Sequence, residues 1–177
     1  MAIRDLTTVV APPTDGIAPG VDWAAIEQRL GLPLPQGYKD FIAAYGQGSF
    51  TDFLHPYQPV TDNEYLDLAN RREIDLDALR TIQTDFPKDV PYRLADSAEL
   101  LPAALTDNGD VVYWHIHDPK DPDGWTITVN ESRGPQWFRC YGGFTSFLAD
   151  VLARRVRASV FPDSFPGPAP TFARHET

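Results

Sequence analysis

Residues 110–130, DVVYWHIHDPKDPDGWTITVN, contain two runs in which apolar and polar side chains alternate. Val112, Trp114 and Ile116 share one phase of the first run, and the second run alternates in the same way from Trp125 onward. Successive side chains of a strand point to opposite faces, so each run predicts a strand with one face toward a core. Pro, Asp and Gly fill the segment between the runs and favour a hairpin connection.

Outward from this hairpin, the period of the apolar residues identifies the neighbouring elements. Residues 136–141, QWFRCY, predict a third strand, which completes an antiparallel meander. Apolar residues recur every three or four positions in 22–31, 35–46 and 144–156, and each of these segments predicts a helix. Residues 63–84 are also helical in pattern, as one helix or two. Helices at both ends of a strand region indicate an α+β fold, a single domain with an antiparallel sheet and short helices packed on it.

Local signals place the helix ends and the domain boundary. Asp22 is typical of an N-cap and Gly31 of a left-handed C-cap, while Pro35 suits a helix start. The chain has 17 prolines, a content that favours short helices. We predict that residues 1–158 form the domain and that the proline-rich residues 159–177 form an extended C-terminal tail. The tail has three phenylalanines for docking: Phe161, Phe165 and Phe172.

The charge of the chain narrows the class of partner. The 177 residues have a net charge of −10 at pH 7, and residues 62–125 alone account for −9 of it. This field disfavours nucleic acid and anionic membranes. No apolar run is long enough for a membrane helix, and the first residues have no signal-peptide pattern. The lone Cys140 gives no sign of an oxidising compartment, so we expect a cytoplasmic protein.

The concentrated negative charge has two interpretations. The functional one is a surface that steers a basic protein partner and speeds association. The other is a set of solvated residues that keep the protein soluble. The predicted partner-binding residues are Asp62, Glu64, Asp67, Asp107, Asp110, Asp118, Asp121 and Asp123.

A metal site is the main chemical alternative. His115 and His117 lie two positions apart on one predicted strand face, next to Asp118, and imidazole with carboxylate is a common zinc ligand set. The same aspartates, with Asp121 and Asp123, lie among prolines and glycine, where Asp commonly stabilises turns. The turn interpretation is favoured, and we expect neither a metal nor another cofactor. A small metal-dependent hydrolase built on these residues remains the alternative function.

No other motif supplies catalytic residues. Cys140 could act as a nucleophile with His115 or His117, but its phase matches that of Phe138, which favours a packing thiol. A nucleophile elbow, a phosphate-binding loop and a dinucleotide-binding motif are all missing from the sequence. Trp114 and Trp125 occupy apolar phases, so packing explains them better than a ligand-binding aromatic cage does. We therefore expect no catalytic residue.

The order of these signals resembles that of a known family. The first block carries the pattern of a short helix, a Gly, a Leu-Pro step and a second helix: Trp23, Ile26, Glu27, Leu30, Gly31, Leu34, Pro35, Tyr38, Lys39, Phe41 and Ile42. Later blocks are DNGDVVYW (107–114), Gly124-Trp125 and GGFTSFLADVL (142–152). In this combination and order, residues 20–155 resemble the SUKH superfamily.

The resemblance implies a mixed α+β domain without enzymatic activity. Many bacterial members of the superfamily are immunity proteins that bind a cognate toxin, often a nuclease, and fungal members are regulators linked to cell-wall synthesis. Because the toxin-contacting residues vary between members, no site can be transferred residue by residue. The resemblance therefore favours a toxin-neutralising binding protein, with a regulatory scaffold as a further alternative.

Overall fold

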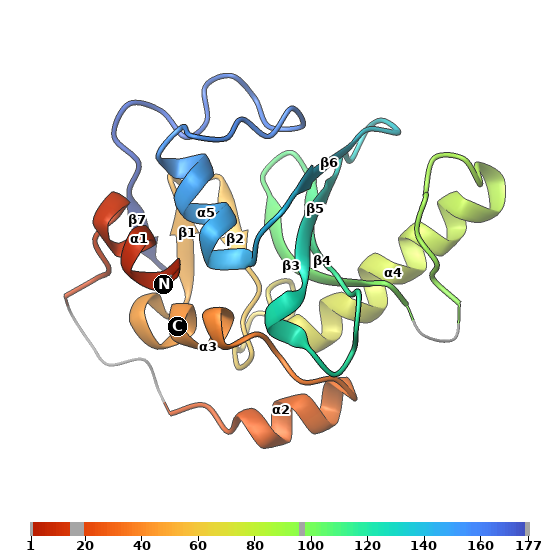
Figure 1. Ribbon diagram of the computed structural model, residues 1–177, viewed down its shortest axis with the longest axis horizontal. Coiled ribbons are helices and arrows are strands. Elements are labelled where there is room, and N and C mark those ends of the chain that lie inside the picture. The colour runs from red at the N-terminus through yellow and green to blue at the C-terminus, as the bar shows by residue number, and fades with distance from the viewer. Residues whose placement is uncertain (1, 15–19, 96–97, 176–177) are drawn as a thin grey trace.

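The computed structural model describes residues 2–14, 20–95 and 98–175 (Figure 1). The helices in these ranges are α1 (Ala2–Val9), α2 (Trp23–Leu30), α3 (Gln36–Tyr45), α4 (Leu68–Asp85), α5 (Phe144–Leu152) and the short 3-10 helix η1 (Pro122–Gly124). The strands are β1 (Gly48–Phe50), β2 (Leu54–Pro56), β3 (Leu100–Thr106), β4 (Val111–His115), β5 (Thr126–Asn130), β6 (Trp137–Cys140) and β7 (Phe172–Arg174). None of the described helices is both long and apolar enough to cross a membrane.

The strands form one antiparallel sheet in the order β6-β5-β4-β3-β2-β1-β7. The predicted α+β class and the β4-β5-β6 meander are confirmed. At the other edge, β7 pairs with β1, with Gly48 opposite Arg174. A Cβ atom on Gly48 would lie 2.3 Å from the carbonyl oxygen of Ala173, so β7 can approach only because residue 48 lacks a side chain.

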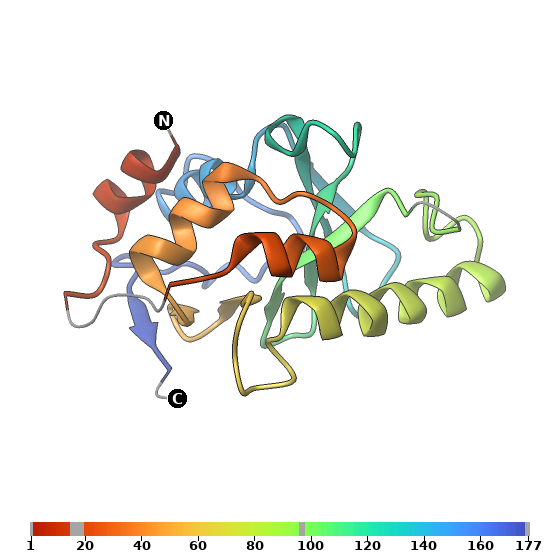
Figure 2. The ribbon, with the colours of Figure 1, turned by 90° about the horizontal axis from the view of Figure 1, so that it is seen from below.

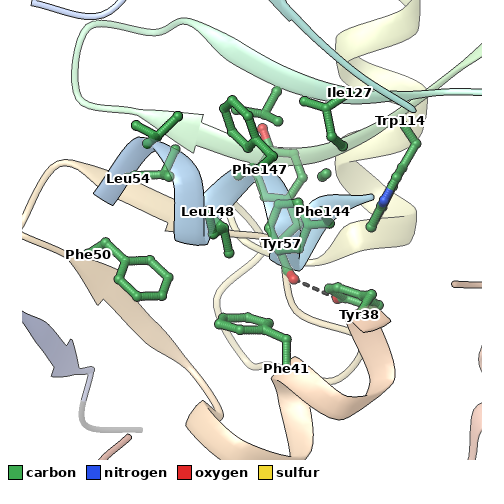
Figure 3. Packing of buried hydrophobic residues seen from close by; sticks show 14 of the residues in the cluster. Tyr38, Phe41, Phe50, Leu54, Tyr57, Trp114, Ile127, Phe144, Phe147 and Leu148 are labelled. Atoms are coloured by element: carbon green, nitrogen blue, oxygen red, sulfur yellow. Dashed lines mark hydrogen bonds between the residues drawn. The ribbon is translucent and has the colours of Figure 1, made fainter. Parts of the chain in front are cut away.

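The first face of the sheet carries a large aromatic core, which we call the large core. Helices α1, α3 and α5 cover this face and pack against one another (Figure 1). Phe41, Phe50, Phe144 and Phe147 are fully buried there (Figure 3). The Tyr38 hydroxyl donates to the Tyr57 carbonyl oxygen at 2.6 Å, which satisfies a polar group inside this core (Figure 3).

The opposite face carries a smaller core, covered by α4. Leu76 and Leu79 of α4 pack there against Val111 and Tyr113 of β4. The predicted alternation is thereby confirmed, because Val112 and Trp114 of the same strand point into the large core. Strand β4 therefore supplies apolar side chains to both faces.

The local helix signals are confirmed in most cases. Asp22 caps α2 by accepting a hydrogen bond from the Ala25 amide at 3.1 Å, and Gly31 ends the helix with φ 67°. Pro35 immediately precedes α3. Helix α5 ends at Leu152, four residues earlier than the apolar pattern predicts, and Arg154 has φ 59°.

The question left open for residues 63–84 is resolved as a single helix that begins at Leu68. Helix α4 has 18 residues, whereas the other α-helices have 8 to 10. It is longer than the proline content predicts because the chain has no proline between Pro59 and Pro87. Strands β1, β2 and β3 and helix α1 were not predicted from the sequence.

The tail packs against the large core. Phe161 is buried, and Phe165 and Phe172 pack against the same cluster, so the predicted docking through these rings is confirmed. The rings of Phe161 and Phe165 contact each other and that of Phe53, with 4.7 Å between the centroids of Phe53 and Phe165, whereas the ring of Phe172 contacts Phe41, Tyr45 and Phe50. Strand β7 then extends the sheet by one edge strand.

Candidate partner-binding surface

The eight predicted partner-binding residues fall into three groups in the structure. One group precedes or caps α4, the second lies in the β3-β4 turn, and the third lies in the β4-β5 connection. The second and third groups lie at opposite ends of β4, because one precedes that strand and the other follows it. The eight carboxylates therefore do not form a single site.

The group at α4 combines exposed and structural carboxylates. Asp62 and Glu64 are exposed in the loop before the helix. Asp67 is the N-cap of α4 and accepts a hydrogen bond from the Asn70 amide at 2.7 Å. It also forms an ion pair with Arg29 of α2 at 3.2 Å. Asp67 thus positions α4 against α2, while its two neighbours face solvent.

The β3-β4 turn holds a buried carboxylate and an exposed one. Asp110 is 3% exposed and accepts hydrogen bonds from the Thr106 hydroxyl and the Ser132 amide, both at 3.0 Å. Its carboxylate stabilises the turn from inside and contributes no exposed charge. The Asp107 carboxylate is 60% exposed and lies 2.8 Å from Nε2 of His55.

The β4-β5 connection joins the sheet to α3. Asp123 accepts a hydrogen bond from the Gln36 amide at 2.7 Å and so caps α3 from a distant part of the chain. Asp118 accepts from the Lys120 amide at 2.8 Å, as expected for an aspartate in a turn. Asp121 is exposed and packs over Gly124.

The histidine pair is brought together without a complete set of metal ligands. The rings of His115 and His117 lie 4.2 Å apart between centroids, and Nε2 of His117 lies 2.9 Å from the Thr126 hydroxyl. Burial lowers the pKa of His115, and the neighbouring His117 lowers it further. Within residues 2–14, 20–95 and 98–175, no three His, Cys, Asp or Glu side chains are grouped so that they could hold a metal ion.

Cys140 has the environment of a packing thiol. It is half-buried and packs with Phe138 against the large core, as its strand phase predicts. Burial raises the pKa of this thiol, and the nearby Asp150 carboxylate raises it further. A raised pKa keeps the sulfur protonated at neutral pH, so it is a poor nucleophile.

A buried polar network that was not predicted from the sequence holds the inner side of α4. The Tyr57 hydroxyl donates to Asp75 at 2.9 Å and accepts from Nε of Arg71 at 3.2 Å. Arg71 also forms an ion pair with Asp75 one helical turn away. Burial raises the pKa of Tyr57 and that of Asp75. The i, i+4 spacing of Arg71 and Asp75 was the available signal for this network.

Exposed apolar side chains are concentrated in one segment. Among the described residues, six large hydrophobic side chains are exposed, and all but Tyr141 lie between residues 60 and 86: Val60, Tyr65, Ile74, Ile82 and Phe86. This segment overlaps the most acidic part of the sequence. Exposed apolar groups with charged neighbours are typical of protein contact surfaces.

These features describe an α+β domain with exposed acidic and apolar groups, in which Cys140 packs against the core and Asp118 stabilises a turn. Comparison with known proteins gives the family: residues 21–148 match the model of the SMI1-KNR4 cell-wall family, SUKH_6. The chain belongs to this family, and the resemblance to the SUKH superfamily is confirmed. The family is generally non-enzymatic and is associated with immunity proteins of toxin systems. No curated protein and no solved structure matches the chain.

Proposed function

We propose that this chain is a binding protein of a bacterial toxin-immunity system, and that it neutralises a cognate protein toxin by forming a non-covalent complex. The observation that carries the proposal is membership of a family associated with immunity proteins. The complex forms in the cytoplasm, a compartment consistent with the single free cysteine. Neutralisation needs only that the complex covers or distorts the active site of the toxin.

The charge of the chain supports a basic toxin, such as a nuclease with a cationic cleft. The net charge is −10, and Asp62, Glu64, Asp118 and Asp121 are exposed carboxylates on loops. Such charges attract a cationic protein over several ångströms and raise the association rate, with less effect on dissociation. We therefore expect the association rate to fall as salt concentration increases.

Co-expression tests the proposal directly. The reading frame next to this gene is expressed under an inducible promoter in a bacterial host, with and without this chain. We expect growth arrest without the chain, recovery with it, and a co-purifying complex of the two proteins. Continued arrest together with the absence of a complex would contradict the immunity function.

Charge reversal tests the contribution of the acidic loops. The double variants Asp62→Lys/Glu64→Lys and Asp118→Lys/Asp121→Lys should each lower the association rate about tenfold at low salt. Asp67 and Asp123 are left unchanged because their carboxylates cap α4 and α3. Asp5→Lys on α1 is the control for a change of charge away from these loops, with half the charge change of each double variant. If both double variants associate at the rate of the control, the acidic loops have no steering role.

A further inference from the structure

The outer side of α4 presents an apolar row to solvent. Ile74, Ala78 and Ile82 recur every four residues and are exposed, and Phe86 follows at the same spacing. Ile74 is 47% exposed and Phe86 is 61% exposed. Residues four apart advance by only about 40° around a helix, so Ile74, Ala78 and Ile82 form a row that winds from the solvent side of α4 toward its flank, where Ile82 lines a cavity with Leu79 and Val90. Phe86 follows this row at the C-cap of the helix. Leu76 and Leu79 already fill the inner side of the helix, so this row is an additional apolar strip on its exposed surface.

An acidic row runs beside the apolar one. Glu73, Asp77 and Asp85 are exposed. Asp77 and Asp85 each lie three positions after an isoleucine of the apolar row, Ile74 and Ile82, and Glu73 lies one turn before Asp77, so the carboxylates border that row. Arg80 is the cation next to this row, and it forms an ion pair with Asp77 at 2.6 Å. Arg71 and Arg72 turn inward, to Asp75 and to the Leu30 carbonyl oxygen. Because Arg71 and Arg72 point inward and Arg80 pairs with Asp77, the exposed carboxylates give this surface of α4 a net negative charge.

Helix α4 is held firmly and its outer side is uncovered. In Figure 2 it runs along the margin of the molecule, with no other described element on its outer side. Its inner side is fixed by the Tyr57-Arg71-Asp75 network and by the smaller core. A rigid helix loses little conformational entropy when a partner covers it.

We propose that the outer side of α4, comprising Glu73, Ile74, Asp77, Ala78, Ile82, Asp85 and Phe86, is the surface on which the toxin docks. This inference rests on the proposed immunity function and locates its interface. The partner surface is an apolar groove bordered by Lys and Arg on the side that meets the acidic row. The negative charge of this surface favours a cationic toxin over a second copy of the chain, because a homodimer would bring two acidic rows together.

The test measures binding of the adjacent reading frame's product, carrying an inactivating substitution, to immobilised variants of this chain. Ile74→Ser/Ile82→Ser removes the apolar row, and Glu73→Lys/Asp85→Lys reverses the acidic one. Tyr141→Ser is the matched apolar control, because Tyr141 is 97% exposed and lies outside α4. Asp5→Lys controls for a change of charge elsewhere on the chain, with half the charge change of Glu73→Lys/Asp85→Lys. All variants are compared with the wild type by thermal unfolding, and binding is measured at a temperature at which every variant is folded, because Ile74 and Ile82 are only 47% and 40% exposed and retain some packing.

We expect Ile74→Ser/Ile82→Ser to weaken binding at least tenfold, mainly through faster dissociation. Glu73→Lys/Asp85→Lys should slow association about tenfold, and both controls should bind like the wild type. Equal affinities for all variants would overturn the docking surface and leave the immunity function standing. Absence of binding by the wild type would overturn both. A homodimer that dissociates on Ile74→Ser/Ile82→Ser substitution would show that a second copy occupies the surface, contrary to the proposal.

Discussion

The two faces of the sheet are stabilised in different ways. Among the residues that the structure describes, the large core contains 30 buried residues, many of them aromatic, and the smaller core under α4 contains eight. The α4 face adds hydrogen-bonded polar groups, notably Asp75, which accepts a hydrogen bond from Tyr57 of the large core, and the pair Tyr92 and Thr128. From this difference we infer that burial in the large core provides most of the stabilisation of the fold. The α4 face contributes less to stability and carries the exposed groups suited to a partner.

The largest expected effect comes from opening the large core. Phe41 is fully buried and its ring contacts those of Tyr45, Phe50, Phe144 and Phe172. Phe41→Ala should lower the free energy of unfolding by about 4 kcal/mol, because it removes apolar contacts and leaves a cavity. Urea denaturation followed by circular dichroism measures the change.

Leu79→Ala in the smaller core is the comparison for this variant. Leu79 is also buried, but it belongs to a smaller cluster at one side of the sheet. We expect a loss of about 2 kcal/mol, at the low end for a buried leucine. Equal losses for the two variants would mean that the faces do not differ in the way their cluster sizes indicate.

The polar network under α4 should give the second largest effect. Tyr57→Phe removes a hydroxyl that bonds to both Asp75 and Arg71, and hydrogen bonds to charged groups are the stronger kind. The expected loss in the free energy of unfolding is about 2 kcal/mol. Tyr45→Phe is the matched control, since its hydroxyl donates to a neutral carbonyl, that of Val10, and should cost about 1 kcal/mol. A smaller loss for Tyr57→Phe than for Tyr45→Phe would contradict the role of the network.

The cap between the β4-β5 connection and α3 should contribute less. Asp123→Ala removes the acceptor for the Gln36 amide and should cost about 1 kcal/mol, as other N-cap replacements do. Asp121→Ala, two residues away, should change the free energy of unfolding by less than about 0.5 kcal/mol, as exposed substitutions usually do. Chemical denaturation of the two variants side by side separates the cap from a general effect of negative charge.

Much of the fold follows from periodicity, and the missed elements are those in which periodicity is lost. Helices α2 and α3 and strand β5 each have one apolar side, so their patterns are clear. Strand β4 is apolar on both faces, but the polar residues His115 and His117, at and just beyond its end, reveal the alternation. Strand β3 is covered on both faces, and its sequence LLPAALT shows a continuous apolar run around Pro102 instead of alternation. Strands β1 and β2 have only three residues each, too few for a pattern.

The candidate surface was predictable as a region but not residue by residue. Counting charged residues along the sequence identifies residues 62–125 as the segment that carries most of the negative charge. It cannot reveal that Asp110 and Asp123 accept hydrogen bonds from the amides of Ser132 and Gln36, which lie 22 and 87 positions away, or that Asp110 is buried. Long-range contacts decide which charges remain available, and the sequence alone does not contain them. The apolar row of α4 was readable by its spacing, but the spacing does not reveal that the row faces solvent.

The smallest expected effect is a dependence on pH that originates on the α4 side of the sheet. His115 packs against Tyr92, and both its burial and His117 lower its pKa in the folded chain. The unfolded chain therefore binds a proton at His115 at a higher pH than the folded chain does. As pH falls below about 6.5, this difference lowers stability, and the full cost is reached once the folded pKa is passed.

Replacement of His115 should reduce this dependence. The free energy of unfolding of the wild type should decrease between pH 7.5 and 5.5, and His115→Gln should decrease less over the same range. Burial also lowers the pKa of His175, whose ring packs against that of His55. Leu54, the residue before His55 on β2, points into the large core. Because strand neighbours point to opposite faces, these imidazoles also lie away from the large core. His115→Gln/His175→Gln should therefore depend on pH less than either single variant. Equal slopes in all four proteins would show that acid acts elsewhere, and that the two faces do not differ in their response to protons.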